Sequence, residues 1–385
     1  MDSFEIKQPQ NESGKKKRKK GCLIAIIVAI LIVLTLIAML IGPFIYQQIV
    51  YEKYGGHGFH YMHGLSSTDF TGYHVHDGEK LAVLDHPADL IIEGVDNMPV
   101  LDGAEACYPL YAAIAKAIYK DIDIIELDAK NEYEEMSAKE YAWRSDNPDD
   151  ERWRWKNGRI VSFYNTKYAY SRLIDKKVDL VFGAVPSKRQ IEDAENAGET
   201  IVTIPIGREG FVFFVEEDNP VDGLTSEEIR KIYSGEITNW KEVGGKNQKI
   251  VPFQRPGASG SQVMMEYFMG DTPLMEPEKY TIDSMSGVLE GVKEYHNERG
   301  AMGYTFHYFL TGLQQEEGVK ILAVDGVYPT IETIKDGSYP LVVNVVCAKL
   351  ESNDDPYVQK VIDFVLSEDG QELIEKTGYA PLKQR

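Results

Sequence analysis

The chain has 385 residues and a formal net charge of −20, with 43% hydrophobic and 26% charged residues, as expected of a globular protein with one or two domains. The charge is uneven, because residues 15–20 read KKKRKK and the rest of the chain is therefore more acidic than the total. An acidic body excludes nucleic acid as the main partner, since phosphate backbones bind basic surfaces, but it still permits one small anion in a local basic pocket.

A basic tail (residues 1–20) precedes an uninterrupted apolar run. Residues 22–41 read CLIAIIVAILIVLTLIAMLI, in which only Thr35 is clearly polar. Twenty helical residues span about 30 Å, the thickness of a bilayer core. We therefore expect one transmembrane helix within residues 21–46, a signal anchor in the cell membrane. The basic flank should stay in the cytoplasm, and the rest of the chain should lie outside.

Residues 47–80 form a predicted linker rich in Gly, His and Tyr. Six histidines cluster here and just beyond: His57, His60, His63, His74, His76 and His86. Their spacing suits a transition-metal ion, because imidazole binds Zn, Cu and Ni. No nearby cysteine or HExxH pair supports a defined site, however. A linker with weak, adventitious metal binding is the favoured alternative, and we predict no metal site and no cofactor.

Three cysteines are too few for a disulfide framework. Cys22 lies at the membrane, so that Cys107 and Cys347 either form one bridge or are both buried small apolar side chains. We favour the second alternative.

Strand and helix patterns alternate along the rest of the chain. Strands are predicted at residues 81–84, 179–185, 200–206, 210–215, 249–253, 320–324 and 339–347, and helices at 107–120, 225–235, 261–270 and 355–378. This alternation predicts an α/β fold with largely parallel sheets, and the length of the exterior part predicts two lobes. Residues 143–159 contain three of the four tryptophans among charged residues. They form either a stacking surface for nucleic acid or carbohydrate, or, as we favour, a surface excursion with partly buried tryptophans.

Residues 254–262 read QRPGASGSQ, between a predicted strand and a predicted helix. Ser259, Gly260 and Ser261 should therefore lie at a helix N-terminus, where free backbone N–H groups and the helix dipole favour an anion. Arg255 can bind an oxyanion with two hydrogen bonds. The alternative is an ordinary capped helix with a surface arginine.

The same stretch resembles the phosphate-binding loop of the phosphate-binding proteins in the periplasmic-type (type 2) solute-binding superfamily, the PstS-like proteins, and most of all their Gram-positive branch. Further resemblances follow in family order: "IYSGEITNW" within residues 206–255, "RGAMGYTFHYF" at 299–309 and "SEDGQELIEKTGYAPL" at 367–382. The resemblance covers about residues 97–385. It implies a two-lobed fold with a hinge of two crossover strands, with lobe 1 at residues 81–205 and 340–385 and lobe 2 at 206–339.

In that family, the loop after the first strand also binds the anion. Here it reads DGAEA, so Gly103, Ala104 and Glu105 line the first-lobe side, with Ser187 as a weaker candidate. Glu105 stands where the family has a hydroxyl residue, and a carboxylate repels a dianion. Several possibilities remain: Glu105 is an outward-pointing or cap-like first-turn helix acid, or it accepts a hydrogen bond from protonated phosphate. It could also pair with Arg255 and close the site without ligand, or signal altered or lost binding.

The resemblance implies an extracytoplasmic binding protein, not an enzyme, that captures phosphate or a similar oxyanion for an ABC-type importer. The absence of a GxSxG elbow, a P-loop and a helix-opening GxGxxG agrees with this. One alternative function is a tethered sensor or scaffold whose phosphate site is altered or lost. Another is a metal-dependent hydrolase that uses the histidine cluster.

Overall fold

The computed structural model describes Thr35 and residues 70–137, 151–255, 259–276, 300–313 and 318–382. Apart from Thr35, the predicted transmembrane run lies outside these ranges, as do the basic tail and most of the predicted linker. Among the residues described, no helix is both long enough and apolar enough to cross a membrane. Residues 57–385 group into one compact unit.

This unit is built from short helices and strands in alternation, which confirms the predicted α/β class. The α-helices are α3 (Tyr108–Ile118), α4 (Ile122–Ser137), α6 (Thr166–Ile174), α7 (Lys188–Asn196), α8 (Ser226–Ser234), α9 (Gly260–Met269), α11 (Ile331–Asp336), α12 (Pro356–Leu366) and α13 (Glu368–Thr377). Shorter helical turns are η1 (Val95–Asn97), η2 (Glu105–Cys107), η3 (Glu151–Asn157), η4 (Trp240–Val243) and the π-turn η5 (Phe309–Leu313). The helices predicted at 107–120, 225–235 and 261–270 are confirmed as α3, α8 and α9.

One mixed sheet has the strand order β1-β2-β9-β3-β6-β5, with β7 and β10 also paired to β3. Its strands are β1 (Leu101–Gly103), β2 (Leu180–Gly183), β3 (Ile201–Glu216), β5 (Val251–Pro252), β6 (Ala301–Phe306), β7 (Val319–Ile321), β9 (Val342–Leu350) and β10 (Ala380–Pro381). A second, two-stranded sheet joins β4 (Gly223–Leu224) to β8 (Ala323–Val324).

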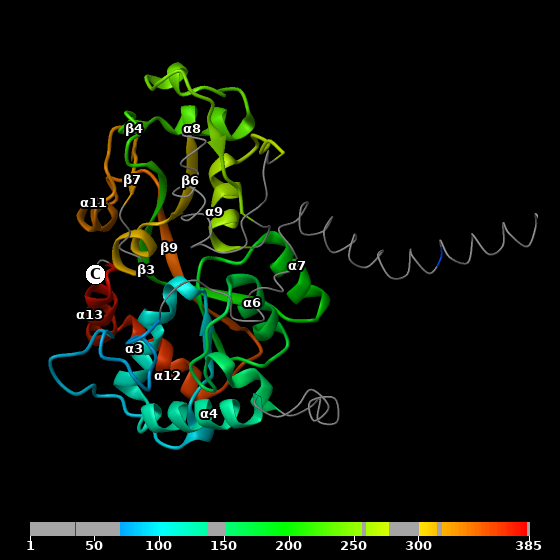
Figure 1. The fold of residues 1–385 in the computed structure, drawn as a ribbon. Helices are drawn as coiled ribbons and strands as arrows, with labels where there is room; N and C mark the ends of the chain where they lie inside the picture. The colour runs from blue at the N-terminus through cyan, green and yellow to red at the C-terminus, as the bar shows by residue number, and fades with distance from the viewer. Residues whose placement is uncertain are drawn as a thin grey trace, which may run out of the picture. The chain divides into compact units, whose positions relative to one another are not determined.

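The prediction that the sheet is largely parallel is wrong. Only β1–β2 and β5–β6 pair in parallel within the described part of the large sheet, whereas β9 runs antiparallel to both β2 and β3. The cause is the path of the chain: β3 carries it from one group of elements to the other, and β9 brings it back in the opposite direction (Figure 1).

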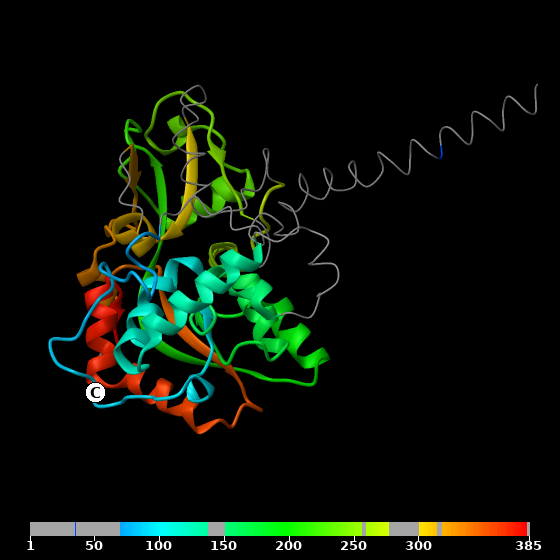
Figure 2. The ribbon, with the colours of Figure 1, turned by 60° about the horizontal axis from the view of Figure 1, so that its bottom comes forward.

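Two large hydrophobic clusters flank this strand pair. The first contains residues of β1, β2 and α3, together with α12 and α13, which pack against one another (Figure 2). The second contains the end of β3 with α8, α9 and β6. Strand β3 contributes Ile206 to the first cluster and Phe211 to the second, and its register against β9 shifts between Pro205 and Gly207. The exact lobe boundaries and the hinge stay predictions.

Two further predictions about elements need correction. The strands predicted at 200–206 and 210–215 are one strand, β3, because Gly207 and Gly210 both keep their pairing to β9. The helix predicted at 355–378 is two helices, since Ser367 adopts an extended conformation and caps α13 by accepting a hydrogen bond from the Gly370 N–H. A side chain at position 370 would collide with the Phe364 carbonyl, so this sharp corner requires glycine.

The strand predicted at residues 81–84 is absent. These residues instead cross the first cluster without a partner strand: Leu81 is buried in it, and Ala82 and Leu84 pack partly against it. The described remainder of the tryptophan-rich stretch forms η3, which packs against α4. The Glu126 carboxylate of α4 accepts three backbone hydrogen bonds, from the N–H groups of residues 159, 160 and 161 (2.7–2.9 Å), and so ties α4 to the chain beyond η3.

The cysteine prediction is confirmed: Cys107 and Cys347 are both free and buried. Of the six clustered histidines, His57, His60 and His63 lie outside the described ranges. The rings of His74 and His76 stack with centroids 5.2 Å apart, whereas His86 lies 3.6 Å from Asp369. Within the described part of the chain, no three metal-ligating side chains come together.

Candidate anion-binding site

The first-lobe loop, residues 102–106, is hydrogen-bonded to β2 and to residue 164. The N–H of Ala104 donates to the Phe182 carbonyl (2.9 Å), and the N–H of Tyr164 donates to the Gly103 carbonyl (3.2 Å). A Cβ on Gly103 would lie 2.2 Å from the Phe182 oxygen, so only glycine permits this close approach. Gly103, Ala104 and Glu105 are all buried, at the point where β1 ends and η2 leads into α3.

Glu105 is only 6% exposed. Glu105 therefore does not face solvent, because a solvent-facing first-turn acid would be largely accessible, although it does lie in the first turn of η2. Three hypotheses stay open: Glu105 is a cap-like acid at the start of this helical turn, it accepts a hydrogen bond from the ligand, or it alters the site.

A buried ion pair lies directly beneath this loop. Asp102 accepts a hydrogen bond from Arg172 Nη1 (2.5 Å) and another from the Gly103 N–H (2.7 Å). The same Arg172 nitrogen donates to Ser162 Oγ (2.9 Å). Burial raises the pKa of Asp102 to about 7, although the Arg172 charge and both hydrogen bonds act in the opposite direction. The pair thus fixes β1 to α6 and to the neighbouring chain segment.

The second part of the candidate site, in the predicted second lobe, is the N-terminus of α9. Ser259 is its N-cap and accepts a hydrogen bond from the Gln262 N–H (3.3 Å). Arg255 is 4% exposed and Ser261 is fully buried, and Arg255 Nη1 donates to Ser261 Oγ (2.7 Å). The predicted arginine and serine therefore lie together, and the alternative of a surface arginine is wrong.

Two residues that the sequence did not single out hold the backbone of this loop. The Arg255 N–H donates to Gln262 Oε1 (3.1 Å) and to the Tyr304 hydroxyl (3.1 Å), and that hydroxyl in turn donates to Gln262 Oε1. Gln262 is the last letter of QRPGASGSQ, and Tyr304 comes from the Gly-Tyr strand β6. The sequence does not indicate this role for either residue, because a buried glutamine or tyrosine can equally be a core residue.

At Gly260, the start of α9 lies close to α6 and to the residue after β2. A Cβ on Gly260 would lie 2.9 Å from Thr166 Oγ1 and 3.3 Å from the Ala184 Cβ. Thr166 is the first residue of α6, capped by Asn165, and Ala184 follows β2. On the other side, Ala104 contacts Gly183. A continuous series of contacts therefore leads from the first-lobe loop to the start of α9, and Thr166 was missed because its helix was not predicted.

Ser187 has a local structural role. Its hydroxyl accepts a hydrogen bond from the Gln190 N–H (3.2 Å), and Gln190 Oε1 accepts one from the Ser187 N–H (2.8 Å), which makes a capping box for α7. Gln190 Nε2 also donates to the Thr166 carbonyl (3.3 Å). The N-termini of α6 and α7 are thereby joined beside the start of α9.

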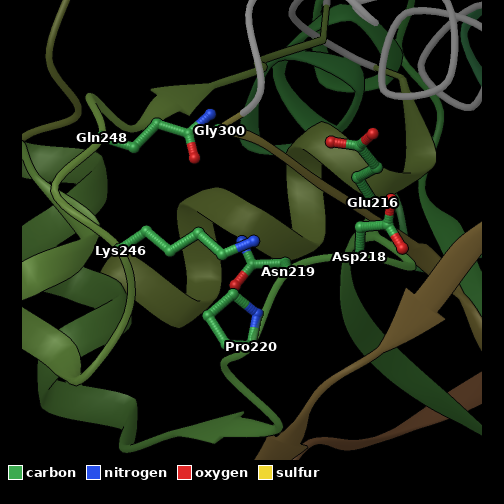
Figure 3. Close-up of a pocket in the computed structure, with 7 residues that line it drawn as sticks. All are labelled: Glu216, Asp218, Asn219, Pro220, Lys246, Gln248 and Gly300. Atoms are coloured by element: carbon green, nitrogen blue, oxygen red, sulfur yellow. The ribbon is translucent and has the colours of Figure 1, made fainter.

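A separate surface pocket of about 280 Å³ shares no residue with this site. Figure 3 shows the residues that line it, among them Lys246 and the acids Glu216 and Asp218. Its walls mix charges of both signs, and none of the sequence-predicted site residues lies there.

The comparisons with known proteins agree with the resemblance. The family model described as "PBP superfamily domain" matches residues 162–369. A protein named phosphate-binding protein PstS from Borreliella burgdorferi is 28% identical over 200 residues, 51% of this chain and 70% of its own length. Its namesake from Bacillus subtilis is 32% identical over 176 residues, 45% of this chain and 55% of its own length. The chain thus spans only about half the length of some of these relatives.

Solved structures give a weaker likeness. An ABC-type phosphate transport receptor from Vibrio cholerae superposes with a TM-score of 0.49 at 22% identity, over 73% of this chain and 99% of that one. PstS from Borrelia burgdorferi superposes with a TM-score of 0.42 at 19% identity, over 77% of this chain and 100% of that one.

Proposed function

The chain belongs to the PBP superfamily, whose domain model matches residues 162–369, and from this premise we propose that it captures inorganic phosphate or a similar oxyanion. The PstS relatives are binding proteins rather than enzymes, and their names state phosphate as the ligand. The ligand would lie between the start of α9 and the loop that follows β1.

The observation that carries this proposal is the pairing of Arg255 with Ser261 at the N-terminus of α9, next to first-lobe residues. The N–H groups of a first helical turn have no partner within their helix, and the helix dipole adds positive potential there. Arg255 supplies a full charge and a planar set of donors. Gly260 allows the α6 and β2 termini to approach closely, so that one anion can contact both groups of elements. Such a ligand would favour the closed arrangement because it binds both sides at once.

We further propose that residues 22–41 anchor the protein in the cell membrane, with the tail on the cytoplasmic side and the binding domain outside. The sequence pattern alone supports this. Deletion of residues 1–46 should move the protein from the membrane fraction to the soluble fraction, and protease added to intact cells should digest the exterior part of the undeleted chain while the cytoplasmic tail is protected. A deletion variant that stays membrane-bound would contradict the anchor. The resemblance also implies an ABC permease as the partner that receives the ligand.

The test of phosphate binding is calorimetry of the full chain in detergent with phosphate, sulfate and a phosphonate. We expect phosphate to bind, and R255A to abolish binding because the site loses the guanidinium that would pair with the anion. The matched control is R230A, which removes an arginine of the same lobe that packs over Phe268 outside the site. Absence of heat from all three anions with a folded protein would contradict the proposal.

The burial of Glu105 gives one alternative function specific support. A carboxylate at 6% exposure within the first-lobe loop can close the site to anions, which would suit a tethered sensor or scaffold. Substitution of this single residue separates the two functions, because phosphate binding should weaken if Glu105 contacts the ligand and tighten if Glu105 blocks the site.

A further inference from the structure

The first turns of two helices beside the site, α6 and α7, carry an unusual charge pattern. Acids are favoured at a helix N-terminus and cations are disfavoured, because the dipole is positive there. Helices α8, α11 and α13 follow the rule, with acids in their first turns. Helices α6, α7 and α9 have none, as is also true of α3 and α12, so the cations of α6 and α7 are what sets these two helices apart. Lys167 is the second residue of α6, and Lys188 and Arg189 begin α7.

These three cations lie close to one another and to α9. The first turns of α6 and α7 are joined by the hydrogen bond from Gln190 to the Thr166 carbonyl. Burial lowers the pKa of Lys167, and the Arg189 charge lowers it further. Burial raises the pKa of Glu266 in α9, and the Lys188 charge acts in the opposite direction. Thr166 and Ala184, which flank these turns in the sequence, are the residues that contact Gly260. The cations therefore lie in the first turns of the two helices, α6 and α7, that approach the start of α9.

Ion pairing does not explain these charges. Within the described ranges, neither Lys167 nor Lys188 forms an ion pair, and Arg189 reaches only Asp193 of its own helix, at 3.9 Å between two exposed side chains. An exposed pair of that kind contributes little to stability. The three cations thus oppose the dipoles of their own helices, and only weak contacts offset this: Lys167 lies 5.8 Å from the Tyr168 ring centroid, the Lys188 charge acts on Glu266, and Arg189 reaches Asp193. These contacts give little reason for the cations in the folding of the domain.

We propose that Lys167, Lys188 and Arg189 form a cationic collar beside the anion site, which draws anions toward it on a protein that is otherwise acidic. The inference rests on the proposed function. A net charge of −20 repels an approaching phosphate at long range. Local positive charge focuses the field and raises the association rate, with a strong dependence on ionic strength. The collar residues act before the ligand is bound, so the dissociation rate should not depend on them.

The test compares K167Q/K188Q/R189Q with K241Q/K246Q/K360Q, which makes the same change in net charge at exposed lysines outside the collar. Both variants are made in the full chain and studied in detergent. Cys22→Ser removes one reactive thiol, and Tyr267→Cys, at an exposed position of α9, carries the fluorophore. Buried Cys107 and Cys347 should not react with the label. Stopped-flow fluorescence with inorganic phosphate then gives association and dissociation rates at low and high salt.

We expect the collar variant to associate about fivefold more slowly at low ionic strength, with an unchanged dissociation rate, and the difference to vanish near 1 M salt. The control should change the rate much less. The collar variant should also melt at the same or a slightly higher temperature, because removal of cations from helix N-termini relieves repulsion; a purely structural role would lower it.

Equal association rates in the two variants would overturn the collar, and so would a faster dissociation rate, since this would make the cations ligand contacts. If the unsubstituted protein binds no phosphate in calorimetry, the proposed function fails and the collar with it. Binding of phosphate without a collar effect refutes the collar alone.

Discussion

Among single residues, Glu105 is the one whose substitution tests most directly what the proposed site binds. Its side chain is buried in the first-lobe loop, which places a carboxyl group beside the proposed position of the anion. A carboxylate can only accept a hydrogen bond from an oxyanion that carries a proton, as phosphate does near neutral pH and sulfate does not.

We therefore expect E105T to weaken phosphate binding about tenfold, the loss of one charge-assisted hydrogen bond, and to admit sulfate. Calorimetry with both anions measures this. The isosteric variant E105Q serves as the matched control, because it keeps the shape and supplies a donor that sulfate can use. Tighter phosphate binding by E105T would instead support the sensor alternative, in which Glu105 blocks the site.

A second buried carboxylate, Glu209 of β3, has no cation partner within the described residues. It accepts hydrogen bonds from the N–H groups of Gly210 (2.8 Å) and Tyr308 (3.3 Å), and burial raises its pKa to about 8. Because the folded pKa lies above the ordinary value of 4.5, the folded state retains this proton. The resulting stability is complete below about pH 4.5 and is lost as the pH rises toward 8.

Replacement of this carboxyl by an amide removes the titration. We expect the unsubstituted protein to lose more unfolding free energy than E209Q between pH 5 and pH 8, by on the order of a few kcal/mol. Urea denaturation at the two pH values measures the difference, with Glu217→Gln, at an exposed position, as the control. Identical pH dependence in E209Q and the unsubstituted protein would show that Glu209 is ionised in the fold.

Between elements, the Asp102–Arg172 pair joins β1 to α6 beneath the first-lobe loop. We expect R172M to destabilise the protein by about 3 kcal/mol, because it leaves Asp102 buried without its partner. The double variant D102N/R172M should recover part of this loss. Thermal denaturation measures both, with Arg208→Met, outside this pair, as control. An R172M variant no less stable than R208M would contradict a role for the pair in holding the loop.

The elements that the sequence predicted correctly are those with strong local signals. The apolar pattern after Ser259 predicted α9. Arg255 and Ser261 were singled out by the QRPGASGSQ stretch and the family resemblance, and their role in binding stays a prediction. Helix α6 was not predicted because Tyr, Lys and Arg interrupt its apolar pattern. Its first residue, Thr166, was therefore not predicted as a neighbour of the site. The single long strand β3 was read as two, since only the pairing with β9 keeps Gly207 and Gly210 extended.

The strand directions of the mixed sheet could not be predicted from local sequence patterns. Whether β9 runs parallel or antiparallel to β3 is decided by the path of the chain through the second cluster, over more than a hundred residues. Likewise, the Tyr304–Gln262–Arg255 network joins side chains from two elements, β6 and α9, to the loop before α9, and their separation in sequence hides it.

For the protein as a whole, the two hydrophobic clusters share β3 and β9, so a ligand held between them should stabilise both. At a phosphate concentration 100-fold above the dissociation constant, binding adds about 2.7 kcal/mol to the unfolding free energy. We expect the melting temperature to rise by roughly 5 °C, given the size of the domain. R255A should show no rise. Equal shifts with chloride at matched ionic strength would indicate a general salt effect instead.

The three backbone hydrogen bonds that Glu126 accepts have a practical consequence. They join residues on the two sides of positions 138–150, and β1 joins the same two sides by its pairing with β2. The polypeptide connection between α4 and η3 is thus duplicated by non-covalent links. Division of the gene within these codons gives two complementary fragments, one ending after α4 and the other beginning before η3, and their reassembly would report on the binding domain in living cells.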